Sequence, residues 1–228
     1  MLATLPRALL EYLRGLGKDD AAIAREAEIH LDDGDGDARV PRERVDALWE
    51  IAAREVGPAV GVRFGLEMPP GNAGVLEVVT QSAPSVEASL GHVCRYWHLL
   101  NDGVDLAIGR GGGEVALTLR PRSDKPLAPP WIDLTVVALA VIGARSIARP
   151  LPPTRIAVPY PEARAVPELG AVVGAPIVFD APSMALVYPE AILERSMLAS
   201  NASLHEVARA HADSQLVRLR EDADGGSV

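Results

Sequence analysis

The first third of the chain carries apolar residues at the three- and four-residue intervals that are typical of amphipathic helices. Leu9, Leu13 and Leu16 form the first of these stripes. The longest one follows Pro41, a residue suited to the first turn of a helix, and consists of Val45, Leu48, Trp49, Ala52 and Val56. The pattern therefore predicts a helical N-terminal third.

The middle of the chain predicts two long helices separated by a hairpin. Residues 84–100 show a helical apolar stripe that ends before a polar Asn-Asp-Gly stop. Apolar and polar residues alternate over 104–108 and 115–119, and the glycine run 111–113 between them favours a tight turn. Residues 129–148 are apolar nearly all round, so we expect a buried central helix there.

The last part of the chain mixes short strands with helices. A strand at 155–158 and a helix at 164–173 are expected first. Residues 176–179 and 184–187 predict a second hairpin, because an Asp-Ala-Pro-Ser turn separates two apolar runs.

A terminal helix is predicted with Ser203 as its N-cap and Glu206 completing a capping box. The full order of elements predicts an α+β fold, in which a small, mostly antiparallel sheet with two hairpins packs against several helices. We expect a single domain over residues 1–220. Residues 221–228 are polar and glycine-rich, so they are interpreted as a linker stub toward a further domain.

Composition narrows the class of protein. The 228 residues are 48% hydrophobic and 23% charged, as in ordinary globular domains, and the formal net charge is -9. DNA-binding surfaces need clustered Lys and Arg, so this acidic chain is not expected to bind DNA directly. The single cysteine, Cys94, allows no intrachain disulfide. The apolar run 134–144 is too short to span a bilayer and no signal peptide is evident, so a cytoplasmic protein without a membrane partner is expected.

An acidic loop and the histidines raise the question of metal binding. Asp33, Asp35 and Asp37 have the spacing of the first three ligands of an EF-hand loop. Ala38 then stands where that loop needs glycine, and Arg44 where it needs a bidentate glutamate. The five histidines show no zinc spacing. A solvated loop is the favoured interpretation, and neither a metal nor a cofactor is predicted.

Catalysis is not expected. Cys94 and His98 lie four residues apart on one predicted helix, and a thiolate–imidazole pair can act as a nucleophile. Cys94 belongs to the apolar stripe, however, and no third group is evident that would orient His98. The chain has no Gly-x-Ser-x-Gly elbow and no phosphate-binding loop. We therefore expect a protein that is not an enzyme.

Four segments resemble one subgroup of AraC/XylS-type transcription regulators. Residues 7–17 (RALLEYLRGLG) look like its opening helix, and residues 74–90 (GVLEVVTQSAPSVEASL) like its central pair of helices with a small-residue break. Residues 95–103 (RYWHLLNDG) continue that motif, and residues 174–189 (GAPIVFDAPSMALVYP) are similar to the closing hairpin. The order and spacing of these segments extend the resemblance over nearly the whole chain.

The resemblance implies the N-terminal effector-binding and dimerisation domain of such a regulator, often described as an arabinose-binding type. In the family, this domain controls an attached helix-turn-helix DNA-binding domain, and the present sequence ends before that part. The implied partners are a small-molecule effector, a second copy of the chain, and DNA only through the missing domain. A dimerisation or interaction module that binds no ligand remains the alternative.

Candidate site residues come from the two long helices and the terminal helix. A small-molecule pocket is apolar with a few placed polar groups, so the aromatic and polar residues among apolar neighbours are the ligand-binding candidates: Arg95, Tyr96, Trp97, His98, Trp131 and Arg145. The alternative is that both tryptophans are core residues and both arginines surface residues. The candidates for dimerisation are apolar residues of the terminal helix, which need cover: Leu204, Val207, Ala208, Leu216 and Leu219.

Overall fold

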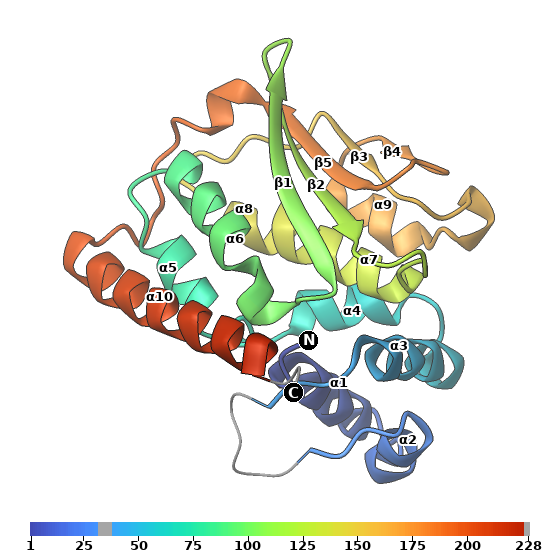
Figure 1. Ribbon diagram of the computed structural model, residues 1–228. Coiled ribbons are helices and arrows are strands. Elements are labelled where there is room, and N and C mark those ends of the chain that lie inside the picture. Colours follow the sequence, from blue (N-terminus) through green and yellow to red (C-terminus); the bar gives the residue numbers. More distant parts are fainter. Residues whose placement is uncertain (32–37, 226–228) are drawn as a thin grey trace.

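The protein is described here by a computed structural model covering residues 1–31 and 38–225 (Figure 1). The expected helical N-terminal third is confirmed, and it consists of α1 (Thr4–Gly15), α2 (Asp20–Glu26), α3 (Arg42–Val56) and α4 (Val60–Glu67). The acidic residues Asp33, Asp35 and Asp37, which were interpreted as a solvated loop, lie outside the described residues.

The remaining elements alternate between helices and short strands. The middle of the chain forms α5 (Val75–Gln81), α6 (Val86–Leu100), β1 (Val104–Gly111) and β2 (Glu114–Pro121). A long helical segment follows as α7 (Pro129–Val136), η1 (Val137–Ile142) and α8 (Gly143–Arg145). The last part contains β3 (Arg155–Ala157), η2 (Glu162–Arg164), α9 (Pro167–Val173), β4 (Ile177–Val178), β5 (Met184–Pro189), η3 (Glu190–Ile192) and α10 (Ala202–Gly225).

The five strands form one sheet in the order β1-β2-β5-β3-β4, and every pairing except β3 with β4 is antiparallel. The expected fold class, an α+β protein with a mostly antiparallel sheet, is therefore confirmed. One row of facing aliphatic residues crosses all five strands: Ile108, Leu117, Leu186, Ile156 and Ile177. Such cross-strand pairs stabilise a sheet and give it one apolar face, which here covers the helical segment α7–η1–α8 (Figure 1).

The first predicted hairpin, β1 with β2, is confirmed, but the second prediction was wrong in its pairing. Both of its strands exist as β4 and β5, yet β3 lies between them in the sheet. The amide of Ile156 donates to the carbonyl of Pro176, and the amide of Val158 to that of Val178. Because helix α9 carries the chain back across the sheet, β4 pairs with β3 in parallel, as crossover connections allow.

The predicted central helix is continuous from Pro129 to Arg145, but its middle part, η1, is a π-helix. A π-helix has a wider turn than an α-helix and is often found at functional sites. Two glycines of α4 bring that helix close to α7 and η1. A Cβ atom at Gly61 would lie 1.9 Å from the carbonyl oxygen of Pro130, and one at Gly65 would lie 3.0 Å from Val137.

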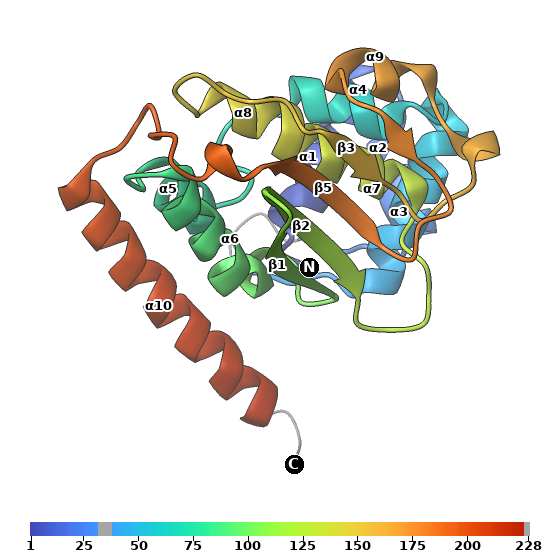
Figure 2. The same cartoon turned by 90° about the horizontal axis from the view of Figure 1, so that it is seen from above.

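The terminal helix α10 differs from its prediction at both ends. Its cap is Asn201 and not Ser203, because the side-chain oxygen of Asn201 accepts a hydrogen bond from the amide of Leu204 at 3.0 Å. The helix also continues to Gly225, through residues expected to form a linker. Figures 1 and 2 show α10 beside α5 and α6, on their side away from the sheet. No helix within the described ranges is long and apolar enough to cross a membrane.

The close contact between α4 and α7 predicts that Gly61→Ala strongly destabilises the fold. The added methyl group would overlap the Pro130 carbonyl, so we expect the free energy of unfolding in urea to fall by about 3 kcal/mol. Gly91→Ala on α6 is the matched control, because its Cβ would meet nothing within 4 Å and alanine favours helix. Equal stability of the two variants would contradict this account of the packing.

Candidate functional site

A cavity of about 440 Å³ lies between α5, α6, the segment α7–η1–α8 and the inner face of the sheet. Helix α6 contributes one wall with Leu90, Val93 and Trp97, which recur at helical spacing. The sheet contributes Leu117 and Tyr188. Its size and largely apolar lining are those of a small-molecule site.

The opposite wall is the segment that contains the π-helix. Trp131 and Leu134 of α7, Ala138, Leu139 and Ile142 of η1, and Arg145 at the end of α8 all line the cavity. One helical segment therefore supplies apolar side chains along its length and a guanidinium group at its end. Arg145 is exposed, which places this group at the mouth of the cavity.

Several polar side chains of the lining form hydrogen bonds within the protein. The carboxylate of Glu77 accepts hydrogen bonds from the Gly71 amide at 2.7 Å and from the Gln81 side chain at 3.3 Å. The hydroxyl groups of Thr80 and Thr135 donate to carbonyls of their own helices. These hydrogen bonds help to hold the walls of the cavity in place.

Other polar groups of the lining have no hydrogen-bond partner among the described residues. They include the buried indole N–H of Trp97, the hydroxyl of Tyr188 and the guanidinium of Arg145. Burial raises the pKa of Tyr188 well above its usual value, so its hydroxyl stays protonated and able to donate. The Tyr188 hydroxyl and the Arg145 guanidinium are therefore donors that a ligand in the cavity can satisfy, whereas the Trp97 N–H is enclosed by the protein.

The six residues predicted to bind ligand lie in three different surroundings. Trp97, Trp131 and Arg145 line the cavity, whereas Arg95, Tyr96 and His98 do not. His98 instead faces Asp105 of β1, with 3.2 Å between its Nε2 and Oδ1 of Asp105.

Arg95 and Tyr96 bind the terminal helix. The Tyr96 hydroxyl donates to Oδ1 of Asp213 at 2.7 Å, and the Arg95 guanidinium donates to the same oxygen at 2.8 Å. These two donors lower the pKa of Asp213, with the Tyr96 hydrogen bond as the largest cause. Helix α6 therefore presents one face to the cavity and a different face to α10.

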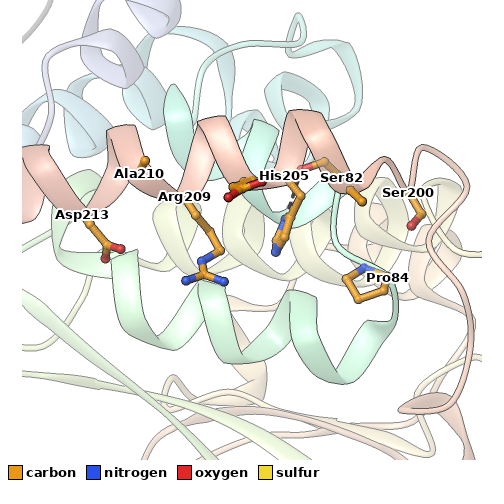
Figure 3. A pocket seen from close by; sticks show the side chains of 9 residues that line it. Ser82, Pro84, Ser200, His205, Arg209, Ala210 and Asp213 are labelled. Carbon is orange, nitrogen blue, oxygen red and sulfur yellow. Dashed lines mark hydrogen bonds between the residues drawn. The ribbon is translucent and has the colours of Figure 1, made fainter.

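A groove of about 530 Å³ lies along α10, and Ser82 and Pro84 of the connection between α5 and α6 also line it (Figure 3). His205 points from α10 into it, and Nε2 of His205 lies 3.1 Å from Nε2 of His92 on α6. Nδ1 of His205 lies 3.2 Å from both the Ser82 hydroxyl and the Val79 carbonyl. Because these groups already bind one another, the groove is part of how α10 docks, and the apolar cavity is the better candidate for a ligand site.

Desolvation, followed by repulsion from His205, lowers the pKa of His92 to about 4. Protonation of His92 therefore works against the packing of α10 on α6. Within the described residues, no group of three or more His, Cys, Asp or Glu side chains could hold a metal ion.

The cavity wall is also joined to α10 through the backbone. The amide of Leu198 donates to the carbonyl of Ser146, and the amide of Ala148 donates to that of Ser196. Ile147 and Met197, which form a bridge between these two segments, both line the cavity. The chain then enters α10 within five residues of Met197.

The apolar residues predicted for dimerisation divide between two faces of α10. Ala208 and Leu216 are buried against their own domain and Leu219 is half-buried. Leu204 and Val207 are 48% and 69% exposed, so only they are open to a partner without rearrangement.

Cys94 and His98 do not form a nucleophilic pair, because His98 faces Asp105. Burial also raises the pKa of the Cys94 thiol to about 11, which keeps it protonated near neutral pH.

The fold and the cavity together are typical of one class of protein, the ligand-binding domains with an α+β fold. The sequence matches the family described as "Arabinose-binding domain of AraC transcription regulator, N-term" over residues 17–197. The chain therefore belongs to this family of regulatory ligand-binding domains. No curated protein matches the chain.

A solved structure supports the fold. The crystal structure of the transcriptional regulator CdpR from Pseudomonas aeruginosa is similar, with a TM-score of 0.63 and 17% sequence identity. The match covers 90% of this chain and 61% of the CdpR chain, so the present chain spans less than two thirds of that regulator.

A buried hydrogen bond to a carboxylate anchors the cavity wall on its other side. The Tyr160 hydroxyl donates to Oδ1 of Asp133, a residue of α7 that does not line the cavity. Desolvation raises the pKa of Asp133 to about 6, and the hydrogen bond from Tyr160 offsets this only in part.

The pKa shifts of Asp133 and His92 predict opposite pH dependences of the free energy of unfolding. The pKa of Asp133 rises on folding from 3.8 to about 6, so its ionisation destabilises the fold as the pH rises through that window. The pKa of His92 falls on folding from 6.5 to about 4, so its protonation destabilises the fold as the pH falls. The two effects oppose each other between about pH 4 and 6.5.

We therefore expect the free energies of unfolding in urea of Asp133→Asn and His92→Gln to change in opposite directions between pH 4 and 7. Relative to wild type, Asp133→Asn should gain stability as the pH rises, by on the order of 2–3 kcal/mol across the window. His92→Gln should gain stability as the pH falls, by less, because His92 is half-exposed and solvent screens its charge. Slopes of the same sign in both variants would contradict these assignments.

Proposed function

We propose that this domain senses a small-molecule effector in the cavity and controls DNA binding by an attached helix-turn-helix domain. The observation that carries the proposal is the position of α6, which has the cavity on one face and α10 on another. Family membership supports the regulatory role, because the family is that of AraC transcription regulators.

The proposed signal passes from the cavity to α10 by two routes. One runs through α5 and α6, whose residues Leu76 and Val93 line the cavity while Ser82 and Tyr96 bind α10. The other runs through the pairing of residues 146–148 with 196–198. A ligand that favours one arrangement of these walls would bias the position of α10. The orientation of a domain attached to α10 would change with it.

We also propose that the domain forms a homodimer through the exposed stripe of α10 around Leu204 and Val207. Large exposed apolar residues on a helix that ends the domain favour a partner surface. An equivalent contact between two copies would place two attached DNA-binding domains at a fixed spacing, as symmetric half-sites require.

Filling the cavity should abolish ligand binding without unfolding the domain. The first step is a thermal-shift screen of the chain against amino acids, sugars, fatty acids and aromatic acids. A compound at a hundredfold excess over its dissociation constant stabilises the fold by about 2.7 kcal/mol. We expect Ala138→Trp to remove this stabilisation, because the side chain of Ala138 lines the cavity.

Ala107→Trp, at an exposed position of β1, is the matched control and should keep the full shift. An unchanged shift in Ala138→Trp would exclude the cavity as the site. A folded chain that binds no compound in the screen would favour the alternative of a ligand-independent interaction module.

The dimer proposal is tested by Val207→Glu. A charge placed in an apolar contact is costly to desolvate, so we expect the mass in light scattering to fall from dimer to monomer. Val178→Glu on β4 replaces a valine that is 49% exposed and lies outside α10, and it should leave the dimer intact. A monomeric wild type, or a dimer that survives Val207→Glu, would overturn the assignment to this stripe.

A further inference from the structure

We propose that the cavity takes an organic acid with an elongated apolar body, whose carboxylate binds at the Arg145 mouth. This inference rests on the proposed function, because it names the chemical class of the effector. It follows from the shape of the cavity, from its charges, and from the polar groups left without a partner.

The lining implies an elongated, apolar ligand body. It follows α6 from Val86 to Asn101, a helix length of about 22 Å, and follows the opposite wall from Trp131 to Ile147. The two walls run in opposite directions, because Val86 and Ile147 both lie beside residues 195–197. Between the ends, the side chains that face the cavity from these walls are mostly aliphatic.

The charges at the cavity favour an anion. Of the described side chains that line it, only Glu77 and Arg145 are charged at neutral pH. Glu77 is already satisfied by the Gly71 amide and Gln81. Arg145 has no ion-pair or hydrogen-bond partner among the described residues, and a guanidinium group matches the geometry of a carboxylate.

The uncharged polar groups of the lining also favour an organic acid as the ligand. Tyr188 lines the cavity, and its protonated hydroxyl has no partner among the described residues, so it is available as a donor to the same carboxylate. Tyr188 and Ile147 both pack against the buried cluster that contains Ile192 and Met197, which places Tyr188 toward the Arg145 end of the cavity. A monosaccharide, in contrast, would place several hydroxyl groups against aliphatic walls, at a cost for each one left without a partner.

The test is calorimetric titration of the chain at pH 7.5 with octanoate, decanoate and dodecanoate, with decanol as the neutral counterpart and L-arabinose as the sugar. We expect at least one acid to bind, and decanol to bind more weakly than decanoate. Arg145→Gln should weaken binding of the acid by about tenfold to a hundredfold, the range of a charge-assisted hydrogen bond, and leave decanol unchanged. Arg149→Gln is the matched control, because Arg149 is exposed nearby but does not line the cavity.

Several results would overturn the inference: no binding by any of the acids, equal affinity for decanoate and decanol, or equal losses in Arg145→Gln and Arg149→Gln. The variant Ala138→Trp separates this failure from failure of the proposed function. If the acids fail but L-arabinose or another metabolite binds and Ala138→Trp blocks it, the sensor stands and the acid class is wrong. If an acid binds equally well to Ala138→Trp, both the class assignment and the cavity are wrong.

Discussion

The arrangement of the whole domain depends on one constraint: α6 must be packed on two faces at once. Its cavity face carries Val93 and Trp97, and its other face carries Tyr96, whose hydroxyl binds Asp213 of α10. Because a helix moves as a rigid unit, any shift that the cavity imposes on one face is also a shift of the docking surface for α10. The short contacts around Asp213 and His205 make that surface directional, since polar contacts depend more strongly on geometry than apolar ones do.

The cavity itself follows from the wall opposite α6. A regular helix with apolar residues all round would be expected to pack tightly on every side. In this protein the segment changes to a π-helix over Val137–Ile142, and Ala138 and Leu139 of this part line the cavity. The wall can keep this opening because it is held elsewhere: Gly61 allows α4 to contact its N-terminal end, and Asp133 binds Tyr160 on the side away from the cavity.

Local patterns in the sequence were enough to predict the helices, the first hairpin and the class of the fold, because periodicity and turn residues act over short distances. Pairing between distant segments was not accessible in this way, so the insertion of β3 between β4 and β5 was missed. The candidate ligand residues show the same limit. Tyr96 and Trp97 are adjacent in sequence, but successive helical residues point about 100° apart, so one faces α10 and the other the cavity. Leu139 and Tyr188 carried no local signal, because an apolar residue that faces a cavity looks like a core residue.

The polar groups of the domain are divided in a way that fits a sensor better than a rigid scaffold. The Glu77 carboxylate and the Thr135 hydroxyl form hydrogen bonds within the protein, whereas the Tyr188 hydroxyl and the Arg145 guanidinium have no partner among the described residues. A carboxylate that binds both groups would form charge-assisted hydrogen bonds that the protein itself does not supply. The same ligand would contact α6 and the Arg145–Ile147 segment together. Helix α6 binds α10 directly, and residues 146–148 pair with residues 196–198 just before α10. A ligand in the cavity would thus be coupled to the position of the terminal helix through shared residues, which is what the proposed control of an attached domain requires.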